Sequence, residues 1–179
     1  LGPYLTAVAK AGADAAGRVY PLGIPVASGS FFPYMVSLSV GLQVVFLPIL
    51  GAIADHSAAK KRLLGAFLVF GATAVAAMFF IRHGQWVFAA LLFILANIGV
   101  NGSFVFYDSL LPHVAAPDEM DRISTAGYAL GYLGGGLFLV ACLGIILAPA
   151  AFGLPSGAGL TPTEATLPTR ITFVLTALW

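Results

Sequence analysis

Long apolar runs separated by short polar stretches dominate the sequence. Four of these runs are long enough to cross a bilayer as α-helices, at residues 31–54, 63–81, 86–107 and 125–147. At a rise of ~1.5 Å per residue, helices of this length cover a hydrocarbon core of ~30 Å. The strands of a membrane β-barrel would be ~10 residues long and would alternate in polarity, and these runs do neither. The pattern therefore predicts spanning helices.

Shorter apolar runs lie at the two ends of the chain. Residues 1–9 have the character of the last turns of a helix, and residues 171–179 begin an apolar run. A span needs about 20 residues, so neither run can cross a bilayer by itself. The sequence also has no initiating methionine. We therefore expect a fragment of a longer protein, with truncated spans at both ends.

The composition predicts that lipid surrounds most of the chain. Hydrophobic residues make up 60% of the sequence and charged residues 8%, and the mean hydropathy is +0.99. A soluble domain carries about 25% charged residues, which is far more than this chain has. The chain therefore has too few charged side chains to cover a surface that faces water. The net charge of +1 argues against a nucleic-acid partner. The single cysteine, Cys142, excludes a disulfide framework or a cysteine-based zinc site.

The loop cations divide evenly between the two sides of the predicted bundle. One side carries Lys60, Lys61, Arg62 and Arg122, and the other carries Lys10, Arg18, Arg82 and Arg170. Three cations of the first set lie beside helix ends within one short loop. Because Lys and Arg are enriched in cytoplasmic loops close to the ends of spans, we expect the first side to face the cytoplasm.

The loop between the first two complete spans is a candidate gate, which we call the gating loop (residues 51–62). Gly51 lies one turn before Asp55, and Lys60 and Lys61 follow. The glycine would let a neighbouring helix pack close to this helix end. An acid followed by cations suits ion pairs that exchange partners as two helix bundles move. The alternative is an ordinary cationic anchor at the membrane surface, and the spacing alone leaves both interpretations open.

The gating loop resembles the loop-two motif of the major facilitator superfamily, G-x-x-x-D-[RK]-x-G-[RK]-[RK]. Gly51, Asp55 and the basic Lys60 match it, whereas His56, Ala58 and Ala59 depart from it. Two further stretches resemble the vacuole-effluxer-like branch of that superfamily. They are Tyr107-Asp-Ser-Leu-Leu-Pro-His-Val-Ala and Arg122-Ile-Ser-Thr-Ala-Gly-Tyr-Ala-Leu-Gly-Tyr-Leu-Gly-Gly.

This resemblance implies an all-α, polytopic transmembrane bundle. The chain would be a partial amino-terminal half of a 12-helix transporter, with helices two to five complete and the ends of helices one and six attached. Such a half packs against a carboxy-terminal half, which this chain lacks. Eukaryotic members of the branch are associated with amino-acid export from the vacuole. The resemblance also places Asp55 and Lys60 on the cytoplasmic side, and we expect a multi-pass protein of the cell (inner) membrane.

Polar side chains within the spans are candidates for a substrate pathway. Asn97 and Asn101 share one helical stripe with Asp108, and Gln43 follows Ser39 by one turn on an earlier span. Polar groups at bilayer depth are costly and usually face a cavity or another helix. We predict that Gln43, Asn97 and Asn101 line the pathway. The alternative is hydrogen bonding between helices, worth roughly 0.6–2 kcal/mol per bond.

Glycines recur along the last complete span. Gly127, Gly131 and Gly135 follow one another at steps of four and form a ridge that permits close contact between helix backbones. A phosphate-binding glycine-rich loop would need a preceding strand, and none is expected here. We therefore predict a helix-packing role, which a sliding helix in a transporter would also use.

These features favour transport over catalysis. We expect secondary active or facilitative transport of a small polar solute, with amino acids as the solute that the resemblance suggests and a proton or cation as a coupling ligand. The sequence contains no HExxH pair, no G-x-S-x-G elbow and no Walker A loop, so we expect no enzyme, no cofactor and no metal. The alternative function is a membrane scaffold or assembly subunit that does not transport.

Overall fold

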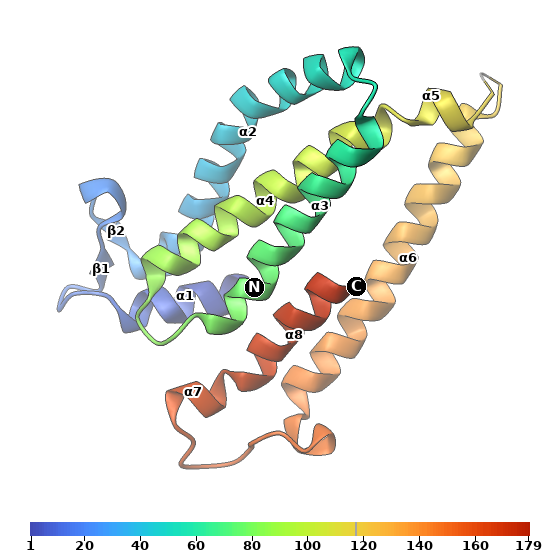
Figure 1. Cartoon of the computed structure of the whole chain (residues 1–179). Helices are drawn as coiled ribbons and strands as arrows, with labels where there is room; N and C mark the ends of the chain where they lie inside the picture. Colours follow the sequence, from blue (N-terminus) through green and yellow to red (C-terminus); the bar gives the residue numbers. More distant parts are fainter. Residues whose placement is uncertain (117) are drawn as a thin grey trace.

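The computed structural model describes residues 1–116 and 118–179, and nearly all of its regular structure is helical (Figure 1). The α-helices are α1 (Gly2–Ala11), α2 (Phe31–His56), α3 (Lys60–Ala77), α4 (Trp86–Asp108), α5 (Leu111–Val114), α6 (Met120–Leu147), α7 (Pro162–Ala165) and α8 (Leu167–Leu178). The 3-10 turns are η1 (Pro21–Gly23), η2 (Ser28–Ser30), η3 (Met78–Phe80) and η4 (Pro149–Phe152), and the strands are β1 (Arg18–Val19) and β2 (Val26–Ala27).

Four helices in the described chain are long and apolar enough to cross a membrane. They comprise Ser28–His56, Lys60–Phe80, Trp86–Asp108 and Met120–Leu147. The predicted fold class, a partial bundle of transmembrane helices, is confirmed. At the two ends of the chain, α1 and α8 are apolar helices too short to span.

Two helices begin earlier than the apolar runs that predicted them. Helix α3 begins at Lys60, so the gating-loop cations form its first turn. Helix α6 begins at Met120 and carries Asp121 in its first turn, where the helix dipole favours an acid. Hydropathy misses these turns because a spanning helix continues through the polar headgroup region beyond the apolar core.

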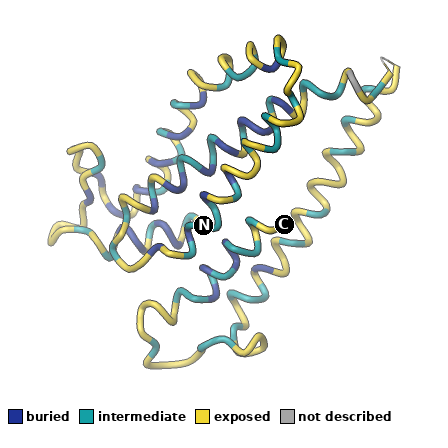
Figure 2. The backbone as a smooth tube through the Cα atoms, viewed as in Figure 1, coloured by how far each residue is buried: buried dark blue, intermediate teal, exposed yellow. Residues whose placement is uncertain are grey.

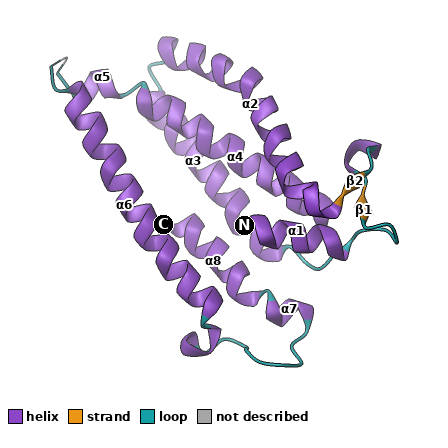
Figure 3. Cartoon of the chain, turned by 180° about the vertical axis from the view of Figure 1, so that it is seen from behind, coloured by secondary structure: helices purple, strands orange, loops and turns teal. Residues whose placement is uncertain are grey.

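The spanning helices form two groups. Helices α2, α3 and α4 pack together, with α3 and α4 in the most extensive contact, while α6 pairs with α8 across from them (Figures 1 and 3). Helix α8 packs more extensively on α3 and η3 than on α6, and so it joins α6 to the other three helices. Exposed apolar side chains cover most of α6, and Leu130 and Leu137 are 70% and 66% exposed (Figure 2). Such a surface suits lipid or another helix bundle and does not suit water.

The α3–α4 contact is a direct approach of two backbones. A Cβ atom added to Gly99 would lie 2.5 Å from the Cα atom of Gly71 and 2.6 Å from its nitrogen. One turn along α4, a Cβ on Gly102 would lie 2.6 Å from the Phe67 ring. A side chain at Gly99 or Gly102 would collide with α3, so glycine is needed at both positions. Such close van der Waals packing is how helices associate in lipid.

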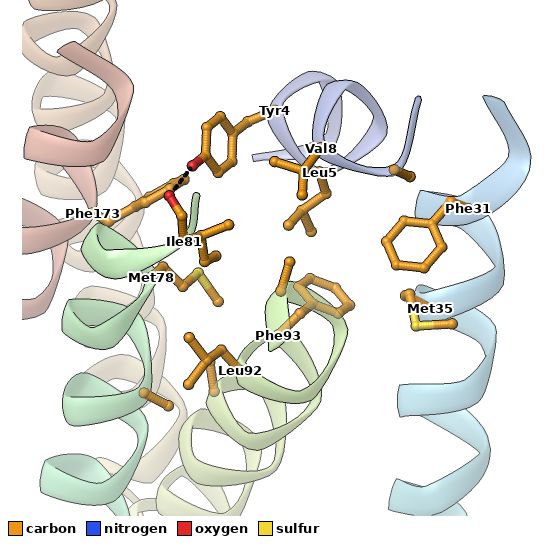
Figure 4. Close-up of a cluster of buried hydrophobic side chains, with 14 of the residues drawn as sticks. Tyr4, Leu5, Val8, Phe31, Met35, Met78, Ile81, Leu92, Phe93 and Phe173 are labelled. Carbon is orange, nitrogen blue, oxygen red and sulfur yellow. Dashed lines mark hydrogen bonds between the residues drawn. The ribbon is translucent and has the colours of Figure 1, made fainter. Parts of the chain in front are cut away.

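A buried apolar cluster holds the end of the bundle farthest from the gating loop, which we call the hairpin end because it carries β1 and β2. Its members come from α1, β1, β2, α2, α3, η3, α4 and α8, and Figure 4 shows a part of it. Tyr4 makes an edge-to-face contact with Phe173 at 5.3 Å between ring centroids, and its hydroxyl donates a hydrogen bond to the carbonyl oxygen of Ile81 at 3.2 Å. The phenol thus joins three elements while its polar atom stays satisfied.

Arg170 fastens α8 to the same end. Its side chain is 8% exposed, its Nε donates to the carbonyl oxygen of Phe79, and its guanidinium lies 4.6 Å from the centre of the Phe79 ring. A cation is favoured at the carboxyl end of a helix, which is where η3 continues α3. The hydrogen bond and the ring contact together offset the cost of burying the charge.

A small hairpin outside the spans completes this end. Strands β1 and β2 pair antiparallel, with Arg18 opposite Ala27. The Asp14 carboxylate accepts hydrogen bonds from the Tyr20 hydroxyl at 2.6 Å and from the backbone nitrogen of Arg18 at 2.8 Å. These bonds favour the ionised acid, so the pKa of Asp14 falls below its ordinary value, with the Tyr20 bond as the largest cause.

The backbone contact makes a prediction about stability. Gly99→Ala should lower the melting temperature of the detergent-solubilised protein, because the new methyl group meets the backbone of Gly71. Overpacking of this kind costs about 1–3 kcal/mol. Gly65→Ala is the matched control in α3, since nothing lies within 4 Å of a Cβ added there. Equal melting of the two variants would show that the helices separate at no cost.

Candidate functional site

The gating loop lies at the end of the bundle opposite the hairpin. Helix α2 ends at His56, whose Nδ1 lies 2.9 Å from the carbonyl oxygen of Ala52. Asp55 is exposed in the last turn of this helix, and nothing lies within 4 Å of a Cβ added at Gly51. In the described part of the chain, no cation comes within the 4.0 Å of the Asp55 carboxylate that an ion pair requires. The carboxylate is therefore exposed and, among the described residues, is in no ion pair.

Lys60 connects the gating loop to the end of α4. Its side chain is half-buried, and its Nζ donates to the carbonyl oxygen of Ser109 at 3.4 Å. The cation lies where the helix dipole of α4 is negative. Lys61 and Lys60 also line an open cleft of about 620 Å³, together with residues 57–59, Arg62 and Leu110. The loop thus presents its cations around a cleft whose lining does not include Asp55.

Gln43 lies on the buried face of α2. It follows Phe31, Met35 and Ser39 at steps of four along that face. The Gln43 Nε2 donates to the Ser39 Oγ at 3.1 Å, so the polar pair expected on this helix is present and buried. The bond stays within one helix. Gln43 does not line any of the clefts described here.

The two asparagines of α4 also satisfy their amide groups locally. Asn97 Nδ2 donates to the carbonyl oxygen of Phe93 at 2.9 Å, and Asn101 Nδ2 donates to that of Asn97 at 2.9 Å. Both side chains are half-buried. Within the described residues, neither side chain hydrogen-bonds another helix. The bond between helices that was the alternative role for these asparagines is therefore not found among those residues.

Asn97 lines a large apolar cleft, which lies between α3 and α4 on one side and α6 and α8 on the other. The cleft holds about 650 Å³, and its aromatic walls include Phe93, Phe138, Phe173 and Trp179. Thr172 and Thr176 of α8 add hydroxyl groups, whose oxygens donate to carbonyls of their own helix. Asn101 and Gln43 lie outside this lining, so the three predicted pathway residues do not meet in one cavity.

The predicted glycine ridge of α6 has few neighbours. A Cβ on Gly127 would lie 3.2 Å from the Tyr107 hydroxyl, and within the described residues nothing lies within 4 Å of a Cβ on Gly131 or Gly135. Gly135 lines the apolar cleft, whereas Gly127 and Gly131 line a smaller cleft beside α4. A packing role for this ridge stays a prediction.

Sequence reasoning missed two features. The sequence predicts Arg170 only as a cation of a loop. Its burial depends on a contact with η3, which is distant in sequence. The tyrosines of the smaller cleft were also passed over, although Tyr128 and Tyr132 stand one helical turn apart and gave a usable signal. Among the described residues, no group of His, Cys, Asp and Glu side chains could hold a metal ion.

Comparison with known proteins agrees with the sequence resemblance. The family model for "Vacuole effluxer Atg22 like" matches residues 7–179. The chain is 30% identical to the MFS-type transporter YxiO of Bacillus subtilis over 98% of this chain and 37% of that protein. It is 38% identical to autophagy-related protein 22 of Coccidioides immitis over 63% of this chain and 20% of that protein. No solved structure matches the chain.

The chain spans well under half of the length of these relatives. The bacterial relative carries a transporter name, and the family description names an effluxer. The four apolar helices of membrane-spanning length fit those names and make this an integral membrane protein. The chain belongs to the Atg22-like vacuole effluxer family, and its bacterial relative is named as a transporter of the major facilitator type.

Proposed function

We propose that this chain forms the amino-terminal half of a secondary transporter that moves a small polar solute by alternating access. The observation that carries the proposal is the cleft of about 650 Å³ that Asn97 lines. Asn97 stands at the midpoint of α4, between Trp86 and Asp108. An apolar cleft with a few polar groups is the usual form of a small-molecule site, and transporters place that site near the bilayer midplane.

The chemistry of the cleft supports a polar solute with an apolar part. Its aromatic walls would bury hydrocarbon. The amide nitrogen of Asn97 donates to its own helix, which leaves the amide oxygen as the group that can accept a hydrogen bond from the solute. An amino acid with an apolar side chain meets this description, in agreement with the family resemblance. A proton or cation gradient, or the gradient of the solute itself, would drive the movement.

The gating loop would control access from the cytoplasmic side. The Lys60 side chain already holds the start of α3 to the end of α4, whereas the Asp55 carboxylate is exposed in the last turn of α2. A second helix bundle that docks on α2 and α6 would bring new partners to Asp55 and Lys61. Exchange of those partners would accompany the rocking of two halves. The multi-pass protein would lie in the cell membrane, with the hairpin end outside.

A membrane scaffold is the alternative function, and the exposed apolar face of α6 favours it. That face, which carries Leu130 and Leu137, could bind other helices without any transport. Flux decides between the two. Full-length protein in proteoliposomes should exchange a labelled mixture of amino acids faster than empty liposomes. Absence of flux for every small polar solute in a broad panel would favour the scaffold.

The gate gives a first prediction. In the full-length transporter, Asp55→Asn should abolish or strongly slow flux while membrane abundance stays near wild type. An acid that served only as a surface anchor would contribute ~0–1 kcal/mol, and its loss would pass unnoticed. Asp118→Asn is the matched control, since Asp118 is an exposed acid at the same end of the bundle. Wild-type flux in Asp55→Asn would return the loop to the role of an anchor.

Asn97 gives a second prediction, which separates pathway from packing. Asn97→Ala should raise the apparent KM several-fold and leave the melting temperature near wild type, because among the described residues the hydrogen bond that the side chain loses lies within α4. Asn101→Ala should show a smaller rise, since Asn101 lies outside the cleft lining. Uptake kinetics and melting are measured on the same preparations. A bond that held helices together would instead lower stability by about 1 kcal/mol with KM unchanged.

A further inference from the structure

A second cleft lies between α4 and α6 at the gating-loop end of the bundle. It holds about 350 Å³ and is lined by Phe104, Tyr107, Gly127, Tyr128, Gly131 and Tyr132. The volume falls at the lower end of the range for small-molecule sites. Three of the six lining residues are tyrosines, and two are glycines of the α6 ridge. The cleft does not share a residue with the apolar cleft that Asn97 lines.

The tyrosines of this cleft present aromatic faces. The Tyr128 and Tyr132 rings are stacked, with centroids 6.5 Å apart and planes at 29°. Tyr107, Tyr128 and Tyr132 are 50%, 42% and 79% exposed, so the described part of the chain leaves their rings partly uncovered. Gly127 keeps the floor of the cleft open beside Tyr107, because a Cβ at this position would come within 3.2 Å of the Tyr107 hydroxyl.

A carboxylate stands at the edge of the cleft. The Tyr128 hydroxyl donates to Oδ1 of Asp108 at 3.2 Å. Asp108 is exposed, and in the described part of the chain its Oδ2 accepts no hydrogen bond and forms no ion pair. The site therefore combines three electron-rich ring faces with one negative charge that has no cation beside it.

From this arrangement we infer that the tyrosine cleft binds an organic ammonium group. Aromatic faces attract a cation within about 6 Å of the ring centre, and cages of aromatic rings recognise quaternary ammonium ions. The Asp108 carboxylate adds attraction for the same charge. Tyrosines that only anchored a helix at the membrane surface would need neither a carboxylate nor a glycine floor. The inference goes beyond the proposed function, since binding at this site does not require transport.

The test compares choline with its neutral isostere 3,3-dimethyl-1-butanol on the full-length protein in detergent free of amine-bearing lipid. Isothermal titration should give a dissociation constant about tenfold lower for choline, which corresponds to about 1.4 kcal/mol. Asp108→Asn and Tyr132→Leu should each remove most of that preference. Tyr128→Phe should keep it, because the ring stays and Asp108 loses only one neutral partner.

Two matched controls guard against general damage. Tyr34→Leu removes an exposed tyrosine from α2, 43% exposed against 79% for Tyr132, and should leave choline binding unchanged. Asp14→Asn breaks the other hydrogen-bonded pair of tyrosine and aspartate, at the hairpin end, and should also leave it unchanged. Equal affinity for choline and the isostere, or a preference that survives both Asp108→Asn and Tyr132→Leu, would overturn the inference.

The ammonium group could belong to a free solute or to a lipid headgroup, because the cleft lies near the end of α4. Nanodiscs of phosphatidylglycerol alone, or with added phosphatidylcholine, distinguish these sources. Competition by phosphatidylcholine that weakens choline binding several-fold assigns the site to a headgroup, and unchanged binding assigns it to a soluble ligand. Both results support an ammonium site. Choline binding without any solute flux would contradict the proposed function and leave this inference standing.

Discussion

The close approach of α3 and α4 at Gly71 and Gly99 is the constraint on which the positions of the other helices and of the polar residues of α4 depend. Between apolar helices in lipid the hydrophobic effect offers little attraction, so association depends on close packing. The two glycines let the backbones meet and fix the rotation of α4 about its axis. Since Asn97 and Asp108 are carried by α4, this rotation turns both toward the side where α6 lies. Helices α2 and α8 then dock on a pair that is already set.

The two ends of the bundle differ in how tightly they are held. At the hairpin end, Tyr4, Arg170 and the apolar cluster join α1, η3 and α8, and every buried polar atom among the described residues has a partner. At the gating-loop end, the long-range polar contacts among the described residues are the Lys60 bond to Ser109 and the Tyr128 bond to Asp108, and both are partly open to solvent. A bundle locked at one end and open at the other suits a body that pivots, which is the movement proposed for alternating access.

The sequence predicted the spans well because apolar length is a local property, and it predicted neighbours poorly because neighbours are not local. Periodicity placed Gln43 and Asn97 on the inward faces of their helices, and both faces are at least partly buried. It could not say which helix each face meets, and only Asn97 lines the apolar cleft. The same limit explains the glycines. The regular ridge of α6 predicts packing, whereas the close backbone contact described above joins Gly71 of α3 and Gly99 of α4.

The polar residues of α4 form a graded series from the middle of the bundle to its end. Asn97 faces the apolar cleft at the midpoint of the helix, Asn101 follows one turn later, and Asp108 ends the stripe beside the tyrosine cleft. The amides donate to their own helix, so they remain satisfied when no solute is present and keep an oxygen free when one arrives. The full charge stands only where the helix reaches the polar surface, because an unpaired carboxylate at bilayer depth is costly. An ammonium group in the tyrosine cleft would therefore have a charged partner near the membrane surface, whereas the polar side chains of the described apolar cleft offer it neutral oxygens.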